Sequence, residues 1–326
     1  MTNPSSTDTS SRPSHMRPFD KQQLSTLIDI ESPEAVHKEV LYTLNLISPK
    51  FNTEPVDRVF RFAVDLYEGK LQEYKACNTD YHNLRHITDT YLAMARLLHG
   101  AQLSDVNFTD REIVLGVTGA LMHDTGMIQE ASDTEGTGAK YTQDHVMLSM
   151  DFVEKHAASL LLESQEVIDL RDMILCTDLM ADITVIDFSS EKIELLGKML
   201  GTADLIAQMA DRTYLEKLLF LFHEFREAKM GDFKNEVDFL HQTVNFFEIS
   251  TKRFKETLDD TNRFMAPHFK ARWDIAENLY FLSLNNQRLY LEKILAEKGK
   301  SIYQELKRDK IVDKVRQKFG KTGMEE

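Results

Sequence analysis

The chain has 326 residues and a formal net charge of −14, with 42% hydrophobic and 28% charged residues. This composition is typical of a soluble globular protein, and the length allows one large domain or two small ones. An acidic chain lacks the basic surface that releases counterions from nucleic-acid phosphates, which argues against a nucleic-acid-binding protein. A small phosphorylated substrate is compatible with this charge if metal ions or local basic groups neutralise its phosphate.

The N-terminal stretch MTNPSSTDTSSRPSHMR is rich in Ser, Thr and Pro. We therefore predict a disordered tail over residues 1–18. It has no apolar signal core, and no apolar run in the chain approaches the ~18 residues of a membrane span, so no membrane partner is expected. The two cysteines, Cys77 and Cys176, form no CxxC pair and are predicted to be reduced thiols of a cytoplasmic protein.

Helix signals dominate the rest of the chain, in which prolines and glycines are sparse. Apolar spacing predicts helices at 57–76 and 82–98, a buried helix at 111–122 and a polar loop at 129–141. Further helices are predicted at 144–162, 164–177, 190–226 with one break near Arg212, 235–264, 270–295 and 301–319. The β-branched segment at 183–188 predicts a strand or an extended connector.

No long alternating pattern indicates a sheet, and no Pro/Gly-rich linker divides the chain. The predicted fold class is therefore all-α. We expect a single compact multi-helix domain over residues 19–326, in which the helices at 265–320 pack on a core formed by residues 75–250. Both a monomer and a homodimer are compatible with the sequence.

Two histidines, His82 and His86, stand four residues apart at the start of a predicted helix. On a helix such residues share one face, so their imidazoles could converge on one site. A chance pair on a helix surface is an equally good explanation of this spacing alone.

Two further segments place ionisable residues in apolar surroundings. His123 and Asp124 end the apolar helix at 111–122, and Asp204 lies inside the apolar run at 201–207. Buried charge is costly unless it is paired or bound to a cation, so metal binding is one explanation. A helix-end hydrogen bond for the His-Asp pair and a buried salt bridge for Asp204 are the alternatives.

Taken together, a histidine, a His-Asp pair and a distant aspartate resemble the HD superfamily of metal-dependent phosphohydrolases. Tyr81-His82-Asn83-x-x-His86 also resembles the YHNxxH motif of the class I cyclic nucleotide phosphodiesterases. Cys176-Thr177-Asp178-Leu179 and Gly201-Thr202-Ala203-Asp204-Leu205 are similar to two further segments of that family. The resemblance covers residues 75–250 and implies an all-helical fold with a deep, metal-bottomed pocket.

This resemblance implies a role for each matching residue. One or two divalent ions (Zn, Fe, Mn or Mg) would be bound by His86, His123, Asp124 and Asp204. His82 would be the general acid that protonates the leaving oxygen. His145 would contact the phosphate or the water shell of a second metal, with a purely structural role as the alternative.

The chain departs from the family in two places. Met127 stands where the HDxxH motif has its second histidine, which puts the second metal site in doubt. The nearest candidates for the family's base-binding pair are Gln242 and Phe246, and their spacing differs by one residue. Two weaker candidates are Asp178, as an acceptor that orients a ligand histidine, and Lys140, as a phosphate contact in the polar loop.

The sequence therefore predicts a metal-dependent phosphohydrolase. Its expected substrate is a small phosphorylated molecule, a nucleotide by resemblance, whose phosphodiester would be cleaved by metal-activated hydroxide with His82 as the acid. Cyclic nucleotides belong to this class. The alternatives are a nucleotide phosphomonohydrolase of the HD superfamily, an HD-type di-iron oxygenase and a non-catalytic sensor.

Overall fold

The computed structural model describes residues 23–297 and 301–320, so the tail predicted at 1–18 lies outside the described residues. Within them the chain forms thirteen α-helices, six short 3-10 helices and no strand, which confirms the all-α prediction. Neither of the two cysteines is in a disulfide. None of the helices in this part of the chain is long and apolar enough to cross a membrane.

The longest connections between the α-helices are those from α2 to α3, from α4 to α5 and from α6 to α7. The first seven are α1 (Pro33–Ile47), α2 (Glu54–Tyr67), α3 (Leu84–Gln102), α4 (Asp110–Met122), α5 (His145–Lys155), α6 (Ser164–Leu175) and α7 (Glu191–Ala210). The next six are α8 (Tyr214–Glu227), α9 (Glu236–Glu256), α10 (Met265–Trp273), α11 (Leu279–Ala296), α12 (Ile302–Glu305) and α13 (Ile311–Phe319). The 3-10 helices are η1 (Leu24–Thr26), η2 (Thr125–Met127), η3 (Gly138–Tyr141), η4 (Ile183–Val185), η5 (Thr261–Phe264) and η6 (Arg308–Lys310).

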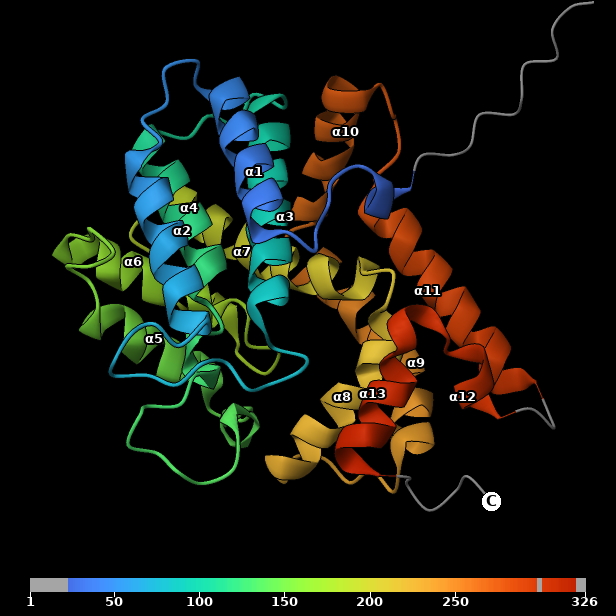
Figure 1. Ribbon diagram of the computed structural model, residues 1–326. Helices are drawn as coiled ribbons and strands as arrows, with labels where there is room; N and C mark the ends of the chain where they lie inside the picture. The colour runs from blue at the N-terminus through green and yellow to red at the C-terminus, as the bar shows by residue number, and fades with distance from the viewer. Residues whose placement is uncertain (1–22, 298–300, 321–326) are drawn as a thin grey trace, which may run out of the picture.

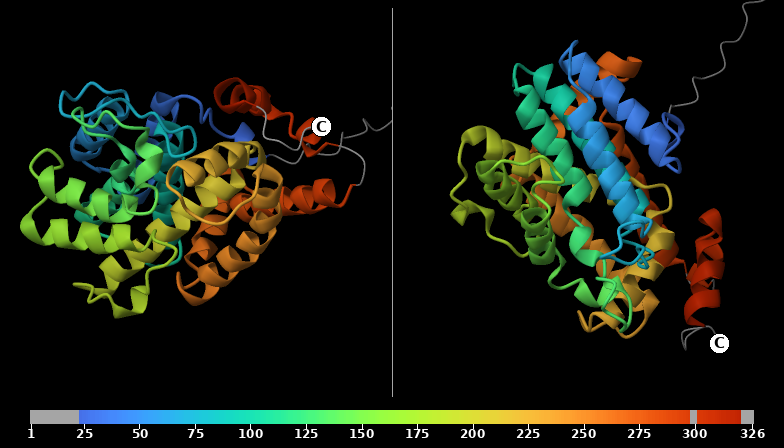
Figure 2. Two further views of the ribbon diagram at one scale, coloured as in Figure 1. Left: turned by 90° about the horizontal axis from the view of Figure 1, so that it is seen from below. Right: turned by 60° about the vertical axis from the view of Figure 1, so that its left-hand side comes forward.

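Helix α7 lies in the middle of the molecule, with α2, α4, α5 and α6 on one side and α9, α11, α12 and α13 on the other (Figures 1 and 2). It packs against α3, α4, α6 and α11. The part of a helix that is surrounded in this way must be mostly apolar, and Leu196, Leu200 and Ile206 of α7 are all fully buried. Buried apolar residues from α1 to α13 belong to one continuous core. The middle of α7 is therefore a place of low dielectric.

Several predicted helix ends are wrong. The helix predicted at 57–76 ends at Tyr67, where the backbone turns through Gly69 at a φ of +72°. The helix predicted at 270–295 is two helices, because Asp274 has a φ of +59° and the Asn278 side chain caps a new helix. Apolar residues continue on both sides of these breaks, so the pattern alone did not reveal them. The segment at 183–188 begins with the 3-10 helix η4 and contains no strand.

A buried histidine pair joins α3 to α10. His99 Nδ1 lies 2.9 Å from His268 Nδ1, and His268 is fully buried. A hydrogen bond between these nitrogens needs one of them to be unprotonated, so the pair cannot be doubly charged. Burial lowers the pKa of both imidazoles, and the nearby guanidinium groups of Arg96 and Arg272 lower that of His268 further.

This pair predicts a loss of stability in acid. The folded-state pKa values of His99 and His268 lie below those of the unfolded chain, so the unfolded state binds protons first as the pH falls. The contribution of this pair to the free energy of unfolding should be constant above pH ~7 and fall by about 1.4 kcal/mol per pH unit for each of the two histidines below pH ~6.5. Urea unfolding at pH 5, 6 and 7 measures this slope. His268→Gln should flatten it, whereas His241→Gln, at an exposed position of α9, should not. An unchanged slope in His268→Gln would contradict the expectation.

Candidate metal centre

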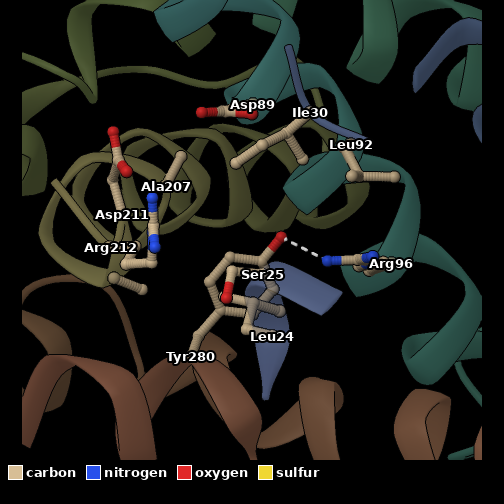
Figure 3. Close-up of a pocket in the computed structure, with 11 residues that line it drawn as sticks. Leu24, Ser25, Ile30, Asp89, Leu92, Arg96, Ala207, Asp211, Arg212 and Tyr280 are labelled. Carbon is tan, nitrogen blue, oxygen red and sulfur yellow. Dashed lines mark hydrogen bonds between the residues drawn. The ribbon is translucent and has the colours of Figure 1, made fainter. Parts of the chain in front are cut away.

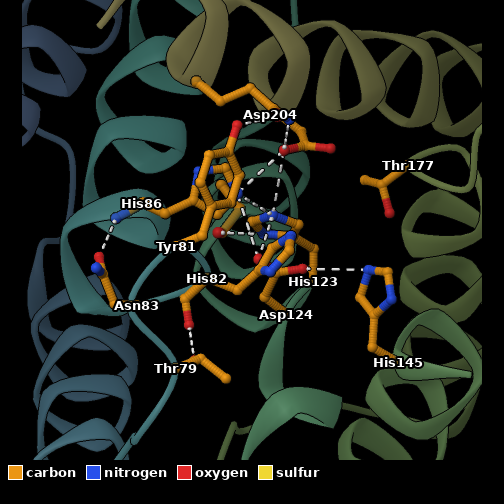
Figure 4. A network of polar contacts seen from close by, with 12 residues as sticks. Thr79, Tyr81, His82, Asn83, His86, His123, Asp124, His145, Thr177 and Asp204 are labelled. Atoms are coloured by element: carbon orange, nitrogen blue, oxygen red, sulfur yellow. Dashed lines mark hydrogen bonds and ion pairs between the residues drawn. The ribbon is translucent and has the colours of Figure 1, made fainter. Parts of the chain in front are cut away.

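Four predicted side chains converge between α3, α4 and α7 (Figure 4). His86 lies in the first turn of α3, His123 ends α4 and Asp124 follows it, while Asp204 comes from α7. All four residues are buried. Because α4 and α7 both pack on α3, three segments that are far apart in the sequence meet at one point.

The distances between these side chains match those of ligands around one ion. His86 Nε2 lies 3.3 Å from His123 Nε2, 3.3 Å from Asp124 Oδ2 and 3.1 Å from Asp204 Oδ1. His123 Nε2 lies 3.5 Å from Asp124 Oδ2 and 3.6 Å from Asp204 Oδ1. Ligand atoms ~2.1 Å from a common metal are separated by roughly 3.0–3.4 Å at tetrahedral or octahedral angles. His86, His123 and Asp124 could therefore hold a metal ion, and Asp204 contacts both of their imidazoles.

The hydrogen bonds around the cluster leave its nitrogen lone pairs available. His123 Nδ1 donates to the backbone carbonyl of Ala120 at 3.0 Å, so its Nε2 carries the lone pair that points into the cluster. Fixing the tautomer of a ligand histidine through its other ring nitrogen is how proteins orient such ligands. Asp204 is fixed in a similar way, because Gln208 Nε2 donates to its Oδ1 at 3.2 Å and Tyr81 donates to Gln208 Oε1 at 2.8 Å.

One carboxylate oxygen of the cluster has only the two imidazoles as polar neighbours. Asp124 Oδ2 is buried and accepts no well-aligned hydrogen bond from the described part of the chain, and His86 Nε2 and His123 Nε2 lie 3.3 and 3.5 Å from it. Leaving a buried carboxylate oxygen without a donor is costly, and a cation at this position would remove that cost. The chemistry of the donor set, two imidazoles and two carboxylates, also suits a divalent transition metal or Mg²⁺.

The charges of the cluster are strongly coupled. Burial lowers the pKa of His86, but its contacts with Asp124 and Asp204 outweigh burial and raise it to about 10. The histidines in turn hold the pKa values of both carboxyls well below their usual range, against the effect of burial. Without a metal, His86 is therefore protonated and provides the positive charge that the two carboxylates require.

His82 lies beside the cluster, although the helical pairing predicted for it is wrong. Helix α3 begins only at Leu84, because the Asn83 side chain caps it by accepting from the backbone N–H of His86 at 3.2 Å. His82 precedes this cap and belongs to the connecting loop. Its ring centroid is still 6.0 Å from that of His86 and 5.9 Å from that of His145.

Glu224 holds His82 in place, and the sequence did not single it out. Its Oε2 lies 2.7 Å from His82 Nδ1, and its Oε1 accepts from the backbone N–H of Tyr81 at 2.7 Å. Burial lowers the pKa of His82, but the Glu224 carboxylate outweighs burial and raises it above its usual value. Glu224 is 5% exposed on α8, within the aromatic stripe around Phe222. An acidic residue among buried aromatics was the available signal.

His145 reaches the cluster from the start of α5. Its Nδ1 is 2.7 Å from the backbone carbonyl of Thr142, and its Nε2 is 3.5 Å from Asp124 Oδ1. This approach depends on Gly126, because a Cβ there would lie 2.1 Å from the backbone oxygen of His145. The glycine after the His-Asp pair therefore allows α5 to pack against the turn that carries Asp124.

Gly126→Ala should destabilise the protein by about 1–3 kcal/mol, the usual cost of forcing extra volume into a packed site. The obstacle is backbone, which cannot move aside without displacing α5. Gly119→Ala is the matched control, because its Cβ would meet only the ends of the Leu200 and Leu170 side chains. Urea unfolding of both variants measures the difference. Equal stability of Gly126→Ala and the wild type would contradict the expectation.

The remaining predicted site residues have other contacts. Lys140 Nζ binds Asp133 Oδ1 at 2.6 Å and the Glu135 carbonyl at 2.7 Å, within the loop at 129–141. Asp178 Oδ1 accepts from the backbone N–H of Met180 at 2.8 Å, which stabilises a turn and orients no histidine of the cluster. No hydrogen bond or ion pair in the described part of the chain joins either residue to His86, His123, Asp124 or Asp204.

The predicted base contacts lie on α9, where Gln242 is exposed and Phe246 is half-buried against the core. Neither has a described hydrogen bond to the cluster, so their role stays a prediction. Met127, at the position where the motif of the resembling family has its second histidine, is 1% exposed and packs as a core residue. Its thioether is a poor ligand for hard metals.

A cavity lies between η1, α3, α7 and α11 (Figure 3). Asp89, Arg96 and Tyr280 line it, and Arg96 donates to the Tyr280 hydroxyl at 2.9 Å. Burial and the nearby Asp211 raise the pKa of Asp89 to about 7. None of the four cluster residues lines this cavity, so it is separate from the metal-bottomed pocket that the sequence predicts.

The chain was compared with known protein families and with curated proteins, and neither a family model nor a curated protein matches it.

Proposed function

We propose that this protein is a metal-dependent phosphohydrolase of the HD superfamily that cleaves a phosphodiester, with a nucleotide as substrate. The observation that carries the proposal is the buried cluster of His86, His123, Asp124 and Asp204, whose spacing and donor atoms suit a divalent ion. The sequence order of these residues resembles that superfamily. His82 lies beside the cluster. It is not one of the four proposed ligands, and its imidazole is paired with the carboxylate of Glu224.

A divalent ion bound by these four residues would neutralise phosphate charge and lower the pKa of a water molecule toward ~7. The chain itself supplies the orientation of the ligands. Ala120 fixes the ring of His123, and Gln208 and Tyr81 fix the carboxylate of Asp204. A site held in this way needs little rearrangement when its ion binds.

His82 is suited to protonating the leaving oxygen. Its Nδ1 is bound to Glu224, so Nε2 is the nitrogen that would donate a proton to a substrate. Glu224 also stabilises the protonated imidazole, which is the form that an acid needs. A phosphodiester has a poor leaving group and gains most from such an acid, which favours a diester over an anhydride as substrate.

The nucleotide part of the proposal rests on the resemblance to the class I phosphodiesterases. Gln242 and Phe246 are the candidates for binding a base, since an amide can pair with its polar edge and a phenyl ring can stack on its face.

Hydrolysis of two chromogenic esters tests the function. Metal-stripped protein is supplied in turn with Mn²⁺, Zn²⁺, Fe²⁺ or Mg²⁺ and given bis(p-nitrophenyl) phosphate or p-nitrophenyl phosphate. We expect metal-dependent cleavage of the diester. Cleavage of the monoester alone would indicate a phosphomonohydrolase instead. Iron binding with oxygen consumption and no hydrolysis would indicate an oxygenase, and metal binding without turnover would indicate a sensor.

A further inference from the structure

We infer that the C-terminal helix α13 is a positioning element for the proposed acid, because it clamps both the loop that carries His82 and the helix that carries Glu224. The inference rests on the proposed function and adds residues to it that no sequence motif contains. Helix α13 is the last helix of the chain, and Figure 1 shows it lying along α8.

The first contact joins α13 directly to the His82 loop. Lys318 Nζ lies 2.5 Å from Asp80 Oδ2. The backbone carbonyl of Asp80 accepts from Asn83 Nδ2 at 2.6 Å, so Asp80 connects α13 to the residue that caps α3. His82 lies between Asp80 and Asn83. The loop lies outside any helix at this point, and side chains hold it: besides these contacts, the hydroxyl of Thr79 donates to the backbone carbonyl of His82.

The second set of contacts joins α13 to α8, partly through the start of α9. Arg316 binds both oxygens of Glu236, the first residue of α9, at 2.9 and 2.8 Å, and Glu236 is fully buried. Glu236 Oε1 also lies 3.0 Å from His223 Nε2. The ring of Phe319 stacks on His223 with 3.9 Å between centroids and an angle of 5° between the planes.

These contacts converge on His82 through neighbouring residues. His223 is next in sequence to Glu224, and Glu224 binds both the ring of His82 and the backbone N–H of Tyr81. Helix α13 therefore fixes the acid from two directions, through Asp80 and through α8. Small displacements of a catalytic group are expensive, since about 1 Å of misplacement can cost roughly 100-fold in rate.

A charge exchange tests this inference on the full-length, metal-loaded protein. Lys318→Asp and Asp80→Lys should each lower kcat for bis(p-nitrophenyl) phosphate by about 10-fold, with KM and metal content unchanged. The double variant should recover most of the lost rate, because the ion pair is restored in reverse. Lys314→Asp is the matched control: Lys314 is exposed on the same helix, and its charge change should leave kcat at the wild-type value.

A second readout does not depend on turnover. The His82 Nδ1–H donated to Glu224 should give a low-field proton resonance in the Zn²⁺-loaded protein, identified by its loss in His82→Ala. We expect Lys318→Asp to shift or broaden it and the double variant to restore it. Phe319→Ala is a second probe of the clamp, because its ring is partly exposed and its loss threatens the core little. It should alter the resonance and lower kcat by a few-fold.

The outcomes separate the two proposals. Wild-type resonance and kcat in Lys318→Asp, Asp80→Lys and Phe319→Ala would overturn the inference and leave the proposed function intact. An altered resonance with wild-type kcat would also overturn it, because the acid would then tolerate the displacement. If the wild type cleaves neither ester with any metal, the proposed function fails. If the resonance is also unaltered in the variants, the inference that α13 positions His82 fails as well.

Discussion

His82→Ala should lower kcat for bis(p-nitrophenyl) phosphate by about 10²–10⁴, the usual contribution of a general acid. The imidazole of His82 contacts Glu224, and its ring centroid lies 6.0 Å from that of His86. His82 is not one of the four residues proposed to bind the metal. Its loss should therefore remove the proton donor and leave the metal content as in the wild type. Steady-state kinetics and metal analysis of the same preparation measure both quantities.

Two further variants make this prediction specific. His241→Ala removes an exposed histidine of α9 and should keep the wild-type kcat. Glu224→Gln keeps the shape of the carboxylate but removes the charge that stabilises the imidazolium. It should lower kcat in the same direction as His82→Ala and by a smaller factor. If His82→Ala kept more than half of the wild-type kcat, His82 would have no role as the acid.

Asp204→Ala should abolish metal binding and turnover together. The carboxylate contacts His86 and His123 at 3.1 and 3.6 Å, so its removal takes a negative charge and a ligand from the centre of the cluster. Loss of a group that merely supports a ligand costs 10–100-fold in metal affinity, so loss of a ligand should cost at least about 100-fold. Metal stoichiometry after dialysis measures this loss directly.

Thermal unfolding gives an independent readout of the same variant. A metal that binds only the folded protein raises Tm, and this increase should disappear in Asp204→Ala. Asp169→Ala is the matched control, since Asp169 is also a buried carboxylate but lies on α6, where Gln165 is its partner. It should keep its metal. Full metal content and full rate in Asp204→Ala would show that the site is assigned to the wrong residues.

Much of the cluster could be predicted from the sequence because its residues conflict with their surroundings. Asp204 stands between alanine and leucine in the buried part of its helix, and His123 and Asp124 end another buried helix. A charged side chain at a buried position is costly unless an opposite charge or a bound cation compensates it. An unexplained charge in an apolar run is a local property, and it is therefore visible without any knowledge of the fold.

The helix class could also be predicted locally, but the helix ends could not. Apolar residues recur at the same spacing before and after Asp274, although the chain turns there and begins α11. The end of a helix depends on which backbone groups find partners in the folded chain. The start of α3 is another example. The helix was predicted to begin at His82 but begins at Leu84, so His82 lies in the loop before it and does not share a helical face with His86.

Contacts between distant segments were decided by the tertiary structure alone. Glu224 is 142 residues away from His82, and Lys318 is 238 residues away from Asp80. No sequence pattern near either residue indicates its partner, because the partners come together only when distant segments pack in the folded chain. Lys140 was predicted to contact a phosphate. In the structure its ammonium group binds Asp133 and the backbone carbonyl of Glu135, which belong to the same loop.

The sequence by itself determined the all-helical class and the residues whose charge needed an explanation, because periodicity and local polarity are written along the chain. The packing of α4 and α7 on α3 decided that those charges share one place, at distances that suit an ion. The packing of α8 and α13 brings Glu224 to His82 and Lys318 to Asp80 of the same loop. Convergence of this kind depends on long-range packing, which no local stretch of the chain specifies.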